Sequence, residues 1–167
     1  METKLESVLT TSMKSATLSY IEDHPESKEE LISLTISNKQ PYAWKAAWYL
    51  GYLIKKNDPE IIQHVETILE ILPKRNESQQ RELLKILLTI DIDEEFEGRL
   101  FDLCIEFWQN PKKPPAIRYY AFKQMYKTAS RHPDLTPELV AILGPQYLDS
   151  LTSGIGASIR KMVRHLL

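Results

Sequence analysis

The amino-acid sequence predicts an all-α protein built from stacked antiparallel helix pairs, and three observations support this prediction. Apolar residues recur at helical spacing along almost the whole chain, with no sustained alternation of period two. The sequence matches itself at a shift of 74 residues without a gap. Prolines and short polar segments interrupt the helical pattern at close intervals, which favours antiparallel neighbours. We therefore expect one domain over residues 1–167, a right-handed α-α superhelix of about four helix pairs plus an N-terminal helix.

Four helices are expected before residue 73, and prolines set most of their ends. The residue before a proline disfavours α-helical geometry, so His24-Pro25 ends the first helix. Ser27 and Glu30 have the spacing of a capping box at the start of the second. Pro41 suits the first turn of the third, where its missing N–H removes no hydrogen bond. The expected positions are residues 5–21, a short helix from 27, 41–57 and 58–72.

The second half of the chain predicts five more helices. Either Asn76 or Ser78 caps the first of them. The acidic segment 91–95 suits the N-terminus of the next, because negative charge is favourable at that end of a helix dipole. Segment 111–115 is a stiff, proline-rich turn. The expected positions are residues 78–88, 96–108, 116–130, 135–148 and 155–167.

The internal repeat is the strongest of the three observations. The shift of 74 aligns Pro41 with Pro115, Ala47 with Ala121, Tyr52 with Tyr126, and Pro59 with Pro133. Steps of 37 residues, half of this shift, connect Trp44 with Arg81 and Arg81 with Arg118. A longer step of 42 residues then connects Arg118 with Arg160. Three residues after these positions stand Ala47, Leu84, Ala121 and Val163, all apolar, which allows a second helix to pack closely. A repeat of this length with two helices per unit is typical of an α-solenoid.

Segment 115–121 resembles the second helix of a HEAT repeat. That helix opens with a proline, followed by an apolar residue and an arginine, with an alanine three residues later; Pro115, Ile117, Arg118 and Ala121 match it. The segments around Arg160, Trp44 and Arg81 match it in part. The resemblance extends over nearly the whole chain and implies a HEAT-like repeat fold. We expect the repeat arginines to be structural, each bonding the end of the preceding helix or a neighbouring side chain.

The second helix of each pair, which we call the inner helix, is expected to carry a surface for a partner. In the helix from Pro41, one row of residues at helical spacing is not needed for packing. The repeat shift predicts the equivalent row on later inner helices. The expected partner-binding residues are Tyr42, Lys45, Tyr49, Tyr52, Lys56, Tyr119, Lys123, Tyr126 and Lys161. The helix starting near Ser78 is expected to add Gln79, Glu82, Ile86 and Thr89. HEAT-like proteins are similar in using this inner, often concave, face. The alternative is that the tyrosines pack beside lysine stems and only cover a solvated ridge.

No catalytic, metal-binding or cofactor-binding constellation is expected. The four histidines lack ligand spacing, with His24 and His132 at equivalent turns before prolines. Cys104 falls in an apolar row, where a buried, inert thiol is expected. The sequence therefore predicts a non-catalytic protein-interaction module.

Charge separates this prediction from its main alternative. Residues 1–110 hold 12 Lys and Arg against 20 Asp and Glu, whereas residues 111–167 hold 9 against 3. Lysines on the inner face would steer an unidentified, acidic protein partner. The alternative is DNA binding or repair, because the chain also loosely resembles HEAT-like alkylpurine DNA glycosylases, with Trp44, Trp48 and Trp108 as aromatic contacts. A net charge of −2 argues against it, since phosphate contacts supply most non-specific affinity.

The compartment predicted is the cytoplasm. A single cysteine excludes an intrachain disulfide, and no apolar stretch approaches the length of a membrane span. The oligomeric state and the identity of the partner stay open at this point.

Overall fold

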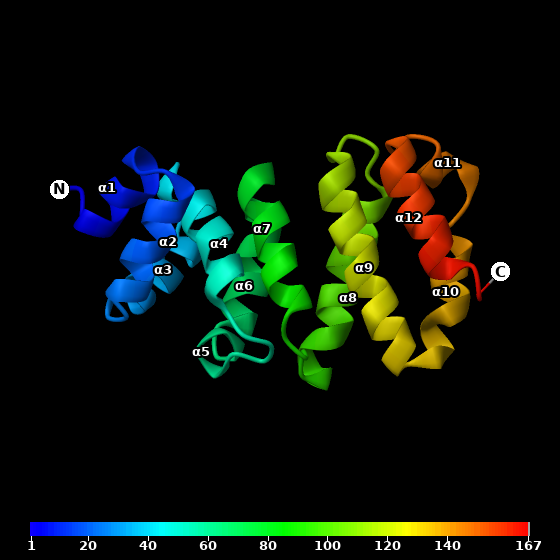
Figure 1. The fold of residues 1–167 in the computed structure, drawn as a ribbon. Coiled ribbons are helices and arrows are strands. Elements are labelled where there is room, and N and C mark those ends of the chain that lie inside the picture. The colour runs from blue at the N-terminus through cyan, green and yellow to red at the C-terminus, as the bar shows by residue number, and fades with distance from the viewer. Residues whose placement is uncertain (167) are drawn as a thin grey trace. The chain divides into compact units, whose positions relative to one another are not determined.

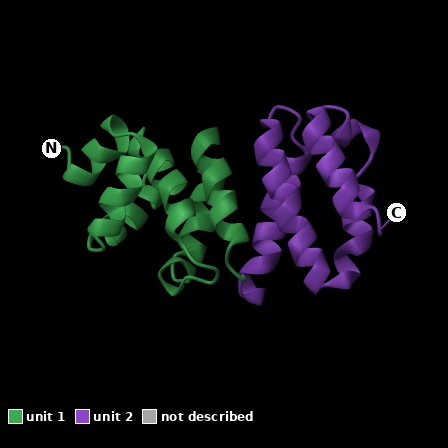
Figure 2. Cartoon of the chain, viewed as in Figure 1, with its two compact units in different colours: residues 1–91 green, residues 92–167 purple. Residues whose placement is uncertain are grey.

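The computed structural model describes residues 1–166, and these residues form helices and connecting turns without a strand. The chain divides into two compact units, residues 1–91 and 92–167 (Figure 2). Each unit has its own packed helices and is described separately. The prediction of one domain stays a prediction, because a repeat array can also contain compact units. Leu167, the expected end of the last helix, lies outside the described residues.

Unit 1 is organised around one central helix, α4, which packs against α3, α7 and α1 (Figure 1). The helices of unit 1 are α1 (Lys4–Thr11), α2 (Lys14–Asp23), α3 (Ser27–Ile36), α4 (Tyr42–Leu53), α5 (Pro59–Ile62), α6 (Val65–Ile71), the 3₁₀ turn η1 (Leu72–Lys74) and α7 (Glu77–Leu88).

The N-terminal region differs from the single helix expected at residues 5–21. Ser12 and Met13 are extended and separate α1 from α2. Buried Thr17 donates a hydrogen bond to the carbonyl of Val8 across this break, so the two short helices fold back on each other. A periodic run of apolar residues does not reveal such a break when no proline or glycine marks it.

The capping box expected at Ser27 was wrong. Glu26 is the N-cap of α3, and the Ser27 hydroxyl donates instead to the carbonyl of His24. A capping box is found at the start of α1, where the Thr3 hydroxyl accepts from the Glu6 amide and the Glu6 carboxylate accepts from the Thr3 amide. The sequence signature is the same in both places.

The middle of unit 1 shows how side chains set helix ends. The helix expected at residues 58–72 is two helices, because the chain turns at Gln63 and His64. Asp58 caps α5 by accepting from the amide of Glu60. Asn76, rather than Ser78, caps α7 by accepting from the amide of Gln79.

Unit 2 is centred on α9, which packs along α8 and also against α10 and α12 (Figure 1). Its helices are α8 (Glu94–Gln109), α9 (Pro115–Arg131), the 3₁₀ turn η2 (Pro133–Leu135), α10 (Thr136–Ala141), α11 (Pro145–Leu148) and α12 (Ser153–Val163). The helix expected at residues 135–148 is interrupted before Gly144-Pro145. Proline lacks the N–H that would continue α10 and instead starts α11.

The small and apolar residues that stand three positions after the repeat positions lie in the cores of the two units. Ala47 and Leu84 are fully buried in unit 1, as are Ala121 and Val163 in unit 2. The repeat therefore predicts correctly that these four positions are packed. Among the described residues, no helix combines the length and apolar character needed to cross a membrane.

Candidate partner-binding surfaces

The open side of α4 is rotated relative to the stripe expected from the sequence. Tyr49 was expected on that stripe, but only 3% of its surface is exposed. Tyr42, one heptad earlier and so on the same side of the helix, is half-buried and donates a hydrogen bond to Glu2. Glu2, just before α1, thus lies over this side, and α1 itself packs against α4. The expectation for Lys56 was also wrong, because α4 ends at Leu53 and Lys56 lies in the following turn.

A row of aromatic side chains occupies the open side instead. Trp44 and Trp48 are half-buried, and Tyr52 is 51% exposed. The rings of Trp48 and Tyr52 meet edge to face with centroids 5.5 Å apart. We call these three residues the aromatic row. Because their spacing is four residues, they form one continuous stripe along α4.

Cations border the aromatic row. The Lys14 ammonium lies 3.8 Å from the centroid of the Tyr52 ring and 5.4 Å from that of Trp48. The Lys45 ammonium lies 5.8 Å from the Trp44 ring. These are the positions of cation–π contacts. Hydrogen bonding to Lys14 is the main cause of the lowered pKa of the Tyr52 phenol, and the charge of Lys85 lowers it further.

The open side of α7 is also shifted by one residue from the expected one. Gln79, Glu82 and Ile86 are buried rather than exposed. Glu82 accepts from Arg81 Nε at 2.8 Å and from Lys85 Nζ at 2.7 Å. Arg81 therefore bonds a neighbouring side chain, and the half-buried cations Arg81 and Lys85 cover the Glu82 carboxylate.

In unit 2 the expected stripe on α9 is partly open. Tyr119, Lys123 and Tyr126 are half-buried and lie on one side of the helix; we call them the α9 stripe. The Lys123 ammonium lies 5.6 Å from the Tyr119 ring. The Tyr126 hydroxyl is 3.4 Å from Nε2 of His165, and the two rings are close to perpendicular. Lys161 is exposed on α12, four residues before His165.

The repeat arginines have different environments. Arg118 is buried and donates from Nε to the carbonyl of Trp108, at the end of the preceding helix, at 2.8 Å. Its other nitrogens donate to the carbonyl of Tyr147 and the hydroxyl of Ser150. Burial lowers the pKa of the Arg118 guanidinium. Arg160, by contrast, is exposed and makes no such bond within the described residues, so the expectation for it was wrong.

The side chains of Cys104, His24 and His132 have the following environments. The Cys104 thiol is buried, and its burial raises its pKa strongly. His24 stacks on Tyr20 and bonds the carbonyl of that residue, and His132 bonds Glu97. Within residues 1–166, no group of three or more His, Cys, Asp or Glu is placed to hold a metal ion.

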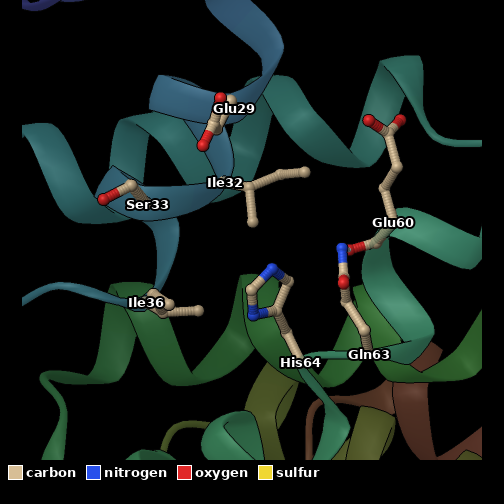
Figure 3. A pocket seen from close by; sticks show the side chains of 7 residues that line it. All are labelled: Glu29, Ile32, Ser33, Ile36, Glu60, Gln63 and His64. Carbon is tan, nitrogen blue, oxygen red and sulfur yellow. Dashed lines mark hydrogen bonds between the residues drawn. The ribbon is translucent and has the colours of Figure 1, made fainter.

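One pocket in unit 1 has a mixed lining. It measures about 470 Å³ and lies between α3 and α5. Figure 3 shows the imidazole of His64 directed into it below Ile32, with Glu29 and Glu60 at its edges. This pocket was not predicted from the sequence. Glu29, Ile32, Ser33 and Ile36 lie on one face of α3 at helical spacing, but no sequence pattern places the segment around His64 across from that face.

Comparison with known proteins gives one match. The model of the HEAT repeat domain matches residues 1–166. No curated protein and no solved structure matches the chain. The family match covers the helices of both units, including the partly matching segments around Trp44, Arg81 and Arg160. The chain therefore belongs to the HEAT repeat domain family.

Proposed function

We propose that the protein is a non-catalytic scaffold that binds an acidic protein partner on the open side of its inner helices. HEAT repeats are generally protein-interaction scaffolds. The observation that carries the proposal is the aromatic row, in which Trp44, Trp48 and Tyr52 are open on one side of α4 beside Lys14 and Lys45. A cytoplasmic location is part of the proposal.

Aromatic burial would provide most of the affinity. Trp and Tyr are enriched at protein interfaces because they present large, rigid surfaces with few rotors. At roughly 25 cal/mol per Å² of apolar surface, covering about 100 Å² on each ring of the row contributes several kcal/mol before the entropy cost of association.

The cations would provide orientation and speed of encounter rather than affinity. Lys14, Lys45 and Lys85 lie at the aromatic row, and Lys123 and Lys161 lie on the inner helices of unit 2. Exposed charges of one sign attract an acidic partner over about 10 Å at moderate ionic strength. The α9 stripe is the second contact region of the proposal.

The proposed scaffold is a right-handed superhelix in which α4, α7, α9 and α12 form the concave layer. The repeat supports such a stack, because a helix pair of a solenoid buries its apolar side against its neighbours. The predicted partner-binding residues that stay in this proposal are Lys45, Tyr52, Tyr119, Lys123, Tyr126 and Lys161, with Trp44 and Trp48 added. Tyr49 is omitted because it is buried.

DNA binding is the second candidate, and the aromatic row is also the observation that favours it. Partly open aromatic rings beside lysines can stack on bases of a single strand. The acidic net charge opposes it, since binding to a phosphate backbone needs a basic surplus. Titration with single- and double-stranded DNA at low and raised salt separates the two: strong, salt-sensitive binding supports DNA, and its absence supports a protein partner.

The direct test places a photo-crosslinking benzoylphenylalanine at Tyr52 or Tyr126 in separate variants. Matched controls carry it at the exposed positions Glu70 on α6 and Glu106 on α8. The proposal expects one protein to be crosslinked from cell extract at Tyr52 and Tyr126 but not at the controls, and its yield to fall when Trp48→Ala is combined with the Tyr52 probe. Equal crosslinking at all four positions, or crosslinking to nucleic acid, would contradict it.

A further inference from the structure

Helices α9 and α12 of unit 2 carry basic residues and no acidic ones. The two helices pack against each other, and Figure 1 shows them side by side with the same chain direction. Residues 115–131 and 150–167 contain seven Lys and Arg but no Asp or Glu. Charge of one sign on two neighbouring helices favours a ligand of the opposite sign.

Two lysines of this helix pair have no carboxylate partner. Within residues 1–166, neither Lys123 on α9 nor Lys161 on α12 forms an ion pair. Lys161 is exposed, and Lys123 is half-buried with its ammonium beside the Tyr119 ring. Both ammonium groups are therefore available to a carboxylate from outside the chain.

The contact between Tyr126 and His165 shows that both lysines lie near the junction of the two helices. The Tyr126 hydroxyl lies 3.4 Å from Nε2 of His165, so these side chains bridge α9 and the turn that follows α12. Lys123 precedes Tyr126 by three residues, and Lys161 precedes His165 by four. Each lysine is thus about one helical turn earlier on the same side of its helix, which is roughly 5 Å along the axis.

A small pocket begins at this bridge and extends toward the end of α9, away from the lysines. It measures about 170 Å³, and its apolar lining residues are Ala129, Pro133, Leu139 and Leu166. This volume is below the roughly 300–1,000 Å³ of sites that hold drug-sized ligands. Its size and lining suit a single aliphatic side chain.

We propose that this surface binds an acidic segment of the partner protein, with one aliphatic side chain in the pocket and carboxylates at Lys123 and Lys161. The inference rests on the proposed function and deepens it, because it gives the chemistry of the partner at the α9 stripe. Lys123 precedes Ala129 by six residues, which is about 9 Å along a helix axis. An extended segment covers this distance in about three residues. The aliphatic residue and its nearest carboxylates are therefore expected two or three positions apart.

The pocket favours a peptide over a nucleic acid. Phosphates would use the same lysines, but a phosphate backbone has no aliphatic side chain to place beside Ala129 and Leu139. A peptide uses both features, the cations for its carboxylates and the pocket for its apolar residue. Binding of an oligonucleotide is therefore a contrary outcome of the test.

The test uses the full chain, labelled with ¹⁵N, and the blocked heptapeptide Glu-Glu-Gly-Leu-Gly-Glu-Glu. Its carboxylates stand two and three positions from the leucine in both chain directions. Amide shifts of Ser130 and Thr136, which line the pocket, are followed in an NMR titration. The proposal expects saturable shifts. Binding should weaken by about tenfold or more when serine replaces the leucine, because the aliphatic burial is lost.

The charge is tested by Lys161→Gln. Binding of the leucine peptide is expected to weaken by about two- to fivefold, the size of one exposed ion pair. Arg99→Gln, which removes an exposed cation on α8 outside the pocket, is the matched control and leaves binding unchanged. The pocket is tested by Ala129→Leu, which fills it from within, so the leucine and serine peptides should bind equally to this variant. If Ala129→Leu does not fold, the comparison of the two peptides on wild type tests the pocket.

Three results would overturn the proposal: equal binding of the two peptides to wild type, unchanged binding in Lys161→Gln, or tighter binding of oligothymidine than of the leucine peptide. Each of them leaves the crosslinking test of the proposed function intact, because the probe at Tyr52 reports on a different surface. Absence of a crosslinked protein at both Tyr52 and Tyr126 would contradict the proposed function itself.

Discussion

The guanidinium of Arg118 lies over the indole of Trp108, 5.1 Å from the ring centroid, and donates from Nε to the backbone carbonyl of the same residue. Two further bonds, to Tyr147 and Ser150, join α9 to the α11 region. One buried side chain therefore connects the end of α8, the start of α9 and α11. Its planar, fixed array of donors suits three acceptors in different directions.

Replacing this arginine should destabilise unit 2. Arg118→Lys keeps the charge but loses the planar array, so at least one buried carbonyl is left without a donor. We expect the free energy of unfolding to fall by about 1.5–3 kcal/mol, the range for lost hydrogen bonds to a charged group. Urea denaturation followed by circular dichroism measures this. Arg160→Lys, on the exposed side of α12, is the control and should change stability by less than about 0.5 kcal/mol.

The close packing at Ala47 gives a second prediction. Ala47 is fully buried on α4, so Ala47→Leu forces extra volume into a packed interface and should destabilise by about 1–3 kcal/mol. Gly51, four residues later, is exposed, and a Cβ added there meets no atom within 4 Å. Gly51→Ala should therefore stabilise the helix by up to about 1 kcal/mol. Thermal unfolding of both variants checks this, and equal effects would contradict the packing described.

The third prediction concerns pH. Hydrogen bonding to Lys39 is the main cause that lowers the pKa of the buried Glu6 carboxyl from its ordinary value of 4.5. A lowered folded-state pKa stabilises the protein above the unfolded value, and this stabilisation is lost as pH falls through the folded value. The free energy of unfolding should thus decrease between about pH 5 and pH 3, and less so in Glu6→Gln. Glu22→Gln, at an exposed position, should keep the wild-type slope. An identical slope in Glu6→Gln would show that this carboxyl has no such role.

The repeat was the part of the fold most accessible from sequence. Ala47 and Ala121 are buried at equivalent positions because the same packing requirement recurs at each inner helix. Breaks within helices were harder to predict. The turn at Ser12 and Met13 has neither proline nor glycine, and the hydrogen bond that stabilises it, from Thr17 to Val8, joins residues in different helices.

The open side of a helix could be predicted only where polar residues mark it. On α9, Lys123, Lys127 and Ser130 identify the side that α8 does not cover. The sequence of α4 is almost continuously apolar, so its periodicity leaves the direction of the packed side undetermined. The packing of α1, α3 and α7 around α4 decides it, with Tyr49 buried and Trp48 partly open.

The proposed role of the aromatic row is tested most directly by the affinity of the protein crosslinked at Tyr52. Isothermal titration calorimetry compares its binding to wild type, to Trp48→Ala and to the control Glu70→Ala on α6. The account predicts that Trp48→Ala weakens binding by at least about tenfold, as expected for a buried aromatic contact, and that Glu70→Ala has no effect. Unchanged affinity in Trp48→Ala, or an equal loss in Glu70→Ala, would contradict it.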